Sequence, residues 1–193
     1  MTKSKTKRRK EVYSDSWMYI LLLTTLVILI ESLKSYTFTI NQVSVTYSIF
    51  LLPIIYLITN YITKKYDYKK SIVAISISGV SLVLFVAIMN FALGKTMDFS
   101  SVSGQFCGYV VSQFVNLTIY KFLLNNTNSP FFLIFLNYLF SLIVFYMFYT
   151  LIHLNMIILD DFWTGYFMVL DIQTVICFIL SIIDSKIRIG IKQ

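Results

Sequence analysis

The chain has 193 residues, of which 58% are hydrophobic and only 13% are charged, and its mean hydropathy is +0.77. A water-soluble domain of this size needs a larger polar surface, so the composition excludes that class. The net charge of +7 could suit nucleic acid, but the basic residues lie at the margins of apolar segments, as in membrane proteins, and we expect no nucleic-acid partner.

Six apolar runs follow a basic tail at residues 1–16, and each is close to the roughly 20 residues that a helix needs to cross a bilayer. The first run lacks a small-residue cleavage pattern, which favours a retained helix over a secretory signal. Pro53 is expected to bend or interrupt the second run. The sequence predicts an all-α integral membrane protein of about six transmembrane helices, with a membrane domain at 17–185 and a basic terminus at 186–193. The runs cover about Trp17–Ser35, Val43–Thr63, Ser71–Gly94, Ser101–Leu124, Pro130–Leu154 and Phe162–Ile183.

The distribution of lysine and arginine predicts the orientation. Of the 16 basic residues, 14 fall on the side of the two termini, and only Lys34 and Lys95 fall on the other. Because cytoplasmic loops carry the excess of basic residues, both termini are predicted to be cytoplasmic. The abundance of Ile, Asn, Lys and Tyr is typical of an AT-rich bacterial genome, so we expect a multi-pass protein of a bacterial inner (cytoplasmic) membrane.

Catalytic signals are missing from the sequence. There is one histidine, no GxSxG, HExxH, CxxC or glycine-rich phosphate loop, and the carboxylates are scattered. The two cysteines lie inside apolar runs without metal-ligand spacing. We therefore expect no enzyme, no metal and no cofactor.

Two carboxylates within apolar runs have different expected depths. Glu31 lies near the outer interface, where it is predicted to pair with Lys34 one turn on. Asp171 lies about nine residues into the last helix, roughly 14 Å deep. It is expected to be protonated, bonded to another helix or exposed to a wet cavity, so a functional role and a structural bond both remain open.

Amide side chains cluster at membrane depth on three of the runs. On the fourth run, Gln105, Ser112 and Asn116 fall close to one face, with Gly108 allowing close approach of another helix. A carboxamide can bind the edge of a planar heterocycle through a donor and an acceptor while an aromatic ring stacks on its plane, although the same amides can instead join helices. The candidate solute-binding residues are Tyr56, Asn60, Tyr109, Gln113, Asn116, Asn137 and Asp171.

From about Phe38 onwards the chain resembles the vitamin-uptake-like membrane family, which includes the queuosine precursor transporters. The stretch FLLPIIYLITNYITKKYDYKKSI is similar to that family's second-helix signature, and GQFCGYVVSQFVNLTIYKFL to its fourth-helix motif. The six-helix layout also agrees.

The chain departs from the family pattern at several positions. Asn60 and Asn116 stand where the family typically has Asp, and Asp67 or Tyr68 replaces the glycine of the second loop. An acidic position on the fifth run and a lysine in the last run have no counterpart. Asn keeps the shape of Asp but carries no charge, so the resemblance implies the binding face without its electrostatics.

The resemblance implies a transporter that imports a deazapurine-like queuosine precursor or a related vitamin-sized solute. Two alternatives stay open. One is the substrate-binding subunit of an energy-coupling-factor-type importer, which needs an ATP-driven energising module as partner. The other is a non-transporting scaffold of the cell envelope, in which the amides join helices and the basic tail binds anionic lipid or a cytoplasmic partner.

Overall fold

The computed structural model describes residues 2–40, 43–94, 99–125, 131–153 and 159–190. Within these ranges the side chains at 2–14, 43–44, 99–101, 125, 153, 159–166 and 188–190 lie outside the description. Lys95, which the orientation argument uses, also lies outside the described residues.

Six long helices form most of the described part of the chain, and the predicted all-α membrane fold is confirmed. They are α1 (Thr2–Leu33), α2 (Leu52–Lys65), α3 (Tyr68–Ala92), α4 (Phe99–Asn125), α5 (Phe131–His153) and α6 (Leu159–Gly190). In the described residues, five segments are long and apolar enough to cross a membrane: Asp15–Leu33, Tyr47–Lys65, Tyr68–Ala92, Phe131–Ile152 and Phe167–Ile187. Helix α4 has the length, at 27 residues, but it carries a row of polar side chains.

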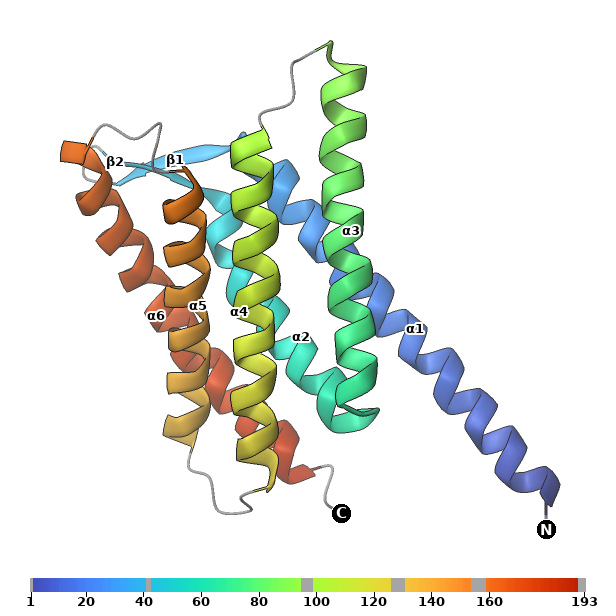
Figure 1. Ribbon diagram of the computed structural model, residues 1–193. Coiled ribbons are helices and arrows are strands. Elements are labelled where there is room, and N and C mark those ends of the chain that lie inside the picture. The colour runs from blue at the N-terminus through green and yellow to red at the C-terminus, as the bar shows by residue number, and fades with distance from the viewer. Residues whose placement is uncertain (1, 41–42, 95–98, 126–130, 154–158, 191–193) are drawn as a thin grey trace.

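Helix α2 lies in the middle of the bundle, in contact with each of the other five long helices. Its polar residues Thr59, Asn60 and Thr63 are buried. A central position explains this, because polar side chains of a membrane-spanning helix face the interior of the bundle. Helix α1 begins and α6 ends at the same end of the bundle, which we call the inner end (Figure 1). The basic residues near that end predict that it faces the cytoplasm.

A β-hairpin lies at the outer end of the bundle, opposite the inner one (Figure 1). Strand β1 (Thr37–Ile40) pairs antiparallel with β2 (Val43–Thr46), and a 3-10 turn, η1 (Tyr47–Phe50), leads from β2 into α2. The sequence-based boundary at Val43 for the second helix is therefore wrong. Six of these eight strand residues are Thr, Val or Ile, and such β-branched side chains favour strands over helices.

Two positions at which a helix begins or ends correspond to residues singled out in the sequence, Pro53 and Asp67. Helix α2 begins only at Leu52, with Pro53 in its first turn, so the expected interruption of the second run occurs. Between α2 and α3, Asp67 adopts φ of 141°, a conformation that favours glycine. Its carboxylate accepts a hydrogen bond from the backbone N–H of Tyr68 at 2.7 Å, which caps α3.

Candidate solute site and the buried polar cluster

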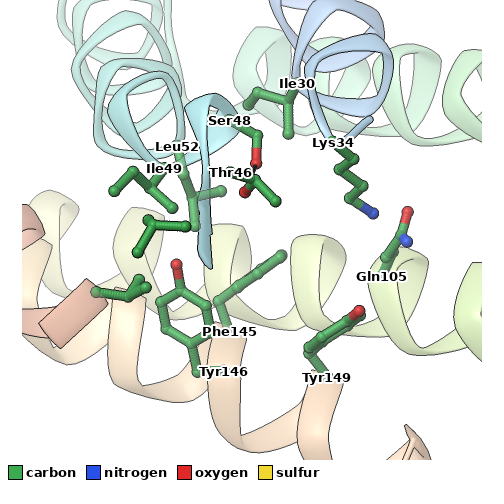
Figure 2. Close-up of a pocket in the computed structure, with 12 residues that line it drawn as sticks. Ile30, Lys34, Thr46, Ser48, Ile49, Leu52, Gln105, Phe145, Tyr146 and Tyr149 are labelled. Atoms are coloured by element: carbon green, nitrogen blue, oxygen red, sulfur yellow. Dashed lines mark hydrogen bonds between the residues drawn. The ribbon is translucent and has the colours of Figure 1, made fainter. Parts of the chain in front are cut away.

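A cavity of about 420 Å³, here called the outer cavity, lies at the outer end of the bundle, where β2 and η1 meet α1, α4, α5 and α6. Its size falls within the range of sites for small molecules. Figure 2 shows the side chains that converge on it from these different elements. They are Ile30, Lys34, Val45, Thr46, Ser48, Ile49, Leu52, Gln105, Phe145, Tyr146, Tyr149 and Val169.

The polar groups of the outer cavity fall into two sets. On one side of the view, Lys34 and Gln105 extend towards each other above Tyr149, and on the other the hydroxyls of Thr46 and Ser48 lie together (Figure 2). The predicted pairing of Lys34 with Glu31 is confirmed, with Nζ 2.8 Å from Oε2, and this Nζ lies 5.9 Å from the centre of the Tyr149 ring. Burial lowers the pKa of Lys34, and the attraction of Glu31 offsets part of that effect.

Contacts below the cavity hold its walls in place. Gln173 of α6 is buried, and its Nε2 donates a hydrogen bond to the carbonyl of Ile49 at 3.0 Å, which fastens η1 to α6. Gly104 and Gly108 let α4 approach α5 closely. A Cβ at Gly108 would lie 2.9 Å from the carbonyl oxygen of Phe145, and one at Gly104 would lie 3.3 Å from that of Tyr149. The two glycines therefore set the position of the α5 residues that line the cavity.

A second polar feature, the Asp184 cluster, lies towards the inner end and joins four helices. The carboxylate of Asp184 on α6 accepts three hydrogen bonds, from Asn60 Nδ2 of α2 at 3.1 Å, Tyr120 Oη of α4 at 3.0 Å and Tyr138 Oη of α5 at 2.7 Å. The chain of bonds continues: Asn116 Nδ2 donates to Asn60 Oδ1 at 2.8 Å, and Asn137 Nδ2 donates to Asn116 Oδ1 at 2.8 Å. All six residues are at most 1% exposed.

The structure brings three of the sequence-predicted residues together and leaves others apart. Asn60, Asn116 and Asn137 belong to the Asp184 cluster. Tyr56 is buried and donates a hydrogen bond to the carbonyl of Ser141 at 3.2 Å, and the Tyr109 hydroxyl lies 2.5 Å from that of Ser78. As solute ligands, all of these residues stay a prediction.

Gln113 is the predicted residue with unused hydrogen-bonding capacity. Its side chain is fully buried, and within the described residues neither atom of its carboxamide has a hydrogen-bond partner. A buried amide without partners is costly, so a water or a solute is the expected occupant beside it.

Asp171 lies apart from these buried groups, exposed on the surface of α6. The apolar segment of α6 starts at Phe167, four residues earlier, so Asp171 lies only about 6 Å from the outer end of that segment. Sequence reasoning missed Asp184 because the last run was taken to end at Ile183. The signal that could have found it is helical spacing, since Gln173, Cys177, Leu180 and Asp184 recur on one buried face.

One face of α4 links the outer cavity with the Asp184 cluster. Gln105 lines the cavity, Tyr109, Gln113 and Asn116 follow at helical spacing, and Tyr120 bonds Asp184. All five side chains are buried. From residue 105 to residue 120 the helix rises about 22 Å, so this polar face spans most of the hydrocarbon thickness.

Comparisons with known proteins leave the family open: no protein-family model, curated protein or solved structure matches the chain. Within the described residues no group of three His, Cys, Asp or Glu side chains is arranged to hold a metal ion. Fold and geometry define the class as a multi-pass helical membrane protein with a cavity at its outer end.

Proposed function

We propose that this protein is a transporter that imports a small solute, which first binds in the outer cavity. The observation that carries the proposal is the pairing of a cavity of about 420 Å³ at one end of the bundle with a sealed polar cluster at the other. An open outer site above a closed inner end is the arrangement expected of one state in alternating access. The proposed location is the cytoplasmic membrane of a bacterium, with the cavity facing outwards.

The proposed solute is a neutral planar heterocycle, of the deazapurine-like queuosine precursor class that the family resemblance implies. Two features of the outer cavity support that chemistry. Tyr146 and Tyr149 offer aromatic rings, and Gln105 carries a carboxamide with both a donor and an acceptor. Glu31 neutralises Lys34, so the cavity has no net charge that would favour an ionised ligand.

The predicted residues deeper in the bundle would meet the solute after it leaves the outer cavity. Tyr109, Gln113 and Asn116 lie below Gln105 on the same buried face of α4. The carboxamide of Gln113 has the hydrogen-bonding capacity for a passing heterocycle. Asn60 and Asn137 would become available only when the bonds of the Asp184 cluster break.

A thermal-shift screen of the purified protein against deazaguanines, purines and vitamins tests the proposal. A ligand of the folded state at a hundredfold excess over its Kd adds about 2.7 kcal/mol of stability. We expect a selective shift with a planar heterocycle, abolished by Gln105→Leu. The matched control is Thr118→Val on the same helix, where the hydroxyl is exposed and bonds only to the carbonyl of Phe114. No shift with any compound, from protein that unfolds cooperatively, would contradict the proposal.

Uptake by the isolated chain in proteoliposomes separates a self-sufficient transporter from a subunit that depends on an energising module. Ligand binding without uptake would favour the subunit.

A membrane scaffold is the second candidate. The hydrogen bonds that join Asn60, Asn116 and Asn137 favour it, since interhelical amides also stabilise static bundles. In a scaffold, Gln105→Leu would leave every function of the chain intact.

A further inference from the structure

We propose that Asp184 is a proton-binding site that holds the inner end of the bundle closed while it is ionised and releases it when it is protonated. Among the residues whose side chains are described, Asp184 is the one buried carboxylate. Its two oxygens accept bonds from α2, α4 and α5, so a single group joins four helices at one depth. The inference rests on the proposed function, because an inner closure has a role in transport only if a solute passes.

The geometry favours an ionised Asp184 in the closed state. All three neighbours are donors: the hydroxyls of Tyr120 and Tyr138 and the amide nitrogen of Asn60. Hydrogen bonds to an ionised acceptor are about twice as strong as neutral ones, and three of them stabilise a buried carboxylate. The described charged or titratable groups that face Asp184 are few. They are Tyr120 from α4, Tyr138 from α5 and Lys64 from α2, whose amine bonds the carbonyl of Ile187 at 2.6 Å.

Asp184 lies close to the inner end of α6. The apolar segment of α6 ends at Ile187, about 4.5 Å beyond Asp184 along the helix, and Lys186 is exposed. In the proton-binding step, an O–H bond of a hydronium ion at the inner surface breaks and an O–H bond forms on Asp184 Oδ1. The carboxylate loses its negative charge, and water is released.

Protonation changes the hydrogen bonds of Asp184. The new acid O–H needs an acceptor, so the Tyr120 hydroxyl must turn from donor to acceptor. The bonds from Asn60 and Tyr138 then end on a neutral oxygen and weaken. Because these bonds tie α2 and α5 to α6, their weakening lets the inner ends of the four helices separate.

Infrared difference spectroscopy of the full chain in nanodiscs tests for the proton. We expect acidification between about pH 10 and 4 to produce a carboxylic-acid C=O band that Asp184→Asn removes and Asp171→Asn keeps. The double variant Asn60→Asp with Asp184→Asn exchanges carboxylate and amide across one hydrogen bond. We expect this double variant to show a carboxylic-acid band at a shifted frequency. It also provides the test if Asp184→Asn alone does not fold. A wild-type spectrum whose bands all persist in Asp184→Asn, or in the double variant without shift, would overturn the proposal.

Thiol labelling tests for the release of the inner end. Ile134→Cys, in a background of Cys107→Ser and Cys177→Ala, places a thiol at a buried site one turn before Tyr138 on α5. Because the thiolate is the reactive form, each rate is divided by that of the exposed Lys69→Cys at the same pH. We expect this ratio to rise about tenfold on acidification, the change that the loss of one bond to a charged group produces. With Asp184→Asn added, the ratio should be high at every pH. A low, pH-independent ratio in both would overturn the release. These readouts need no solute, so a failed ligand screen and a failed proton site are separate results.

Discussion

Lys34 lines the outer cavity and comes directly after Leu33, the last residue of α1. Its side chain is 30% exposed and its amine contacts Glu31 at 2.8 Å, but burial still lowers its pKa. Because the pKa is lower in the folded than in the unfolded chain, the unfolded chain binds more protons between the two values. Stability therefore rises with pH across that window, which ends near the ordinary lysine pKa of about 10.4.

We predict that the melting temperature of the wild type increases relative to that of Lys34→Met as the pH rises from about 8 to 10. Thermal unfolding in detergent at several pH values measures this difference. Ser32→Ala changes a nearby exposed side chain without removing a titrating group and should run parallel to the wild type. Parallel curves for Lys34→Met as well would show that the desolvation of Lys34 is negligible.

At the scale of single residues, the sequence predicted the pairing of neighbouring side chains but not which carboxylate is buried. The Glu31–Lys34 pair follows from helical spacing alone, and it is present. The choice of Asp171 as the deep carboxylate depended on where the last helix begins and which face is buried. Helical spacing places Asp184 on one face with Gln173 and Cys177, but which face of α6 is buried is decided by contacts with α2, α4 and α5, about 50 to 120 residues away in the chain.

At the scale of elements, the α4–α5 contact controls the shape of the outer cavity. We predict that Gly108→Ala destabilises the protein by about 1–3 kcal/mol and weakens solute binding, because its Cβ would lie 2.9 Å from the Phe145 carbonyl and displace α5. Gly104→Ala should have a smaller effect. Gly79→Ala is the control, since its Cβ meets a movable Phe106 ring at 3.1 Å. Thermal unfolding ranks the three variants, and an equal effect of all three would contradict the role of the close backbone contact.

The turn between α2 and α3 combines a strained residue with a cap. Asp67 has φ of 141°, which costs about 1–3 kcal/mol for a residue other than glycine, and its carboxylate caps α3. We predict that Asp67→Gly is up to about 1 kcal/mol more stable than the wild type, because relief of strain exceeds the lost cap. Asp67→Ala keeps the strain and loses the cap, so it should be about 1 kcal/mol less stable. Chemical denaturation checks the order, and a stability of Ala above Gly would refute it.

Element types were predictable where hydrophobic runs are long, and less so where they are short. Twenty apolar residues have few alternatives to a transmembrane helix, so the number of long helices follows from the sequence. The hairpin at Thr37–Thr46 was missed because Val43 and Val45 extend the apolar run that continues into α2. The contacts that make this segment a strand come from outside it. Phe38 pairs with Val45, and the ring centres of Phe38 and Tyr47 lie 4.9 Å apart.

At the scale of the whole molecule, the two polar features divide the bundle into an outer and an inner half. The outer cavity depends on the hairpin, η1 and the Gly104–Gly108 contact, and the Asp184 cluster joins the helices below it. The polar face of α4 connects the halves without a gap longer than one helical turn between Gln105, Tyr109, Gln113, Asn116 and Tyr120. In the proposed transport cycle, substrate entry, passage and release would depend on different residues, which can be varied separately.

The orientation of the bundle would decide the direction of the proposed transport, and it is open to a direct measurement. We predict that a membrane-impermeant maleimide labels Thr37→Cys on β1 in intact cells, and labels Lys69→Cys in the α2–α3 turn region only after permeabilisation. Both positions are exposed, and Cys107→Ser with Cys177→Ala removes the native thiols. The reason is the excess of lysine and arginine at the inner end, which retains that end in the cytoplasm. Labelling of Lys69→Cys in intact cells, with Thr37→Cys protected, would invert the bundle. The cavity would then open to the cytoplasm, and the same geometry would describe an exporter.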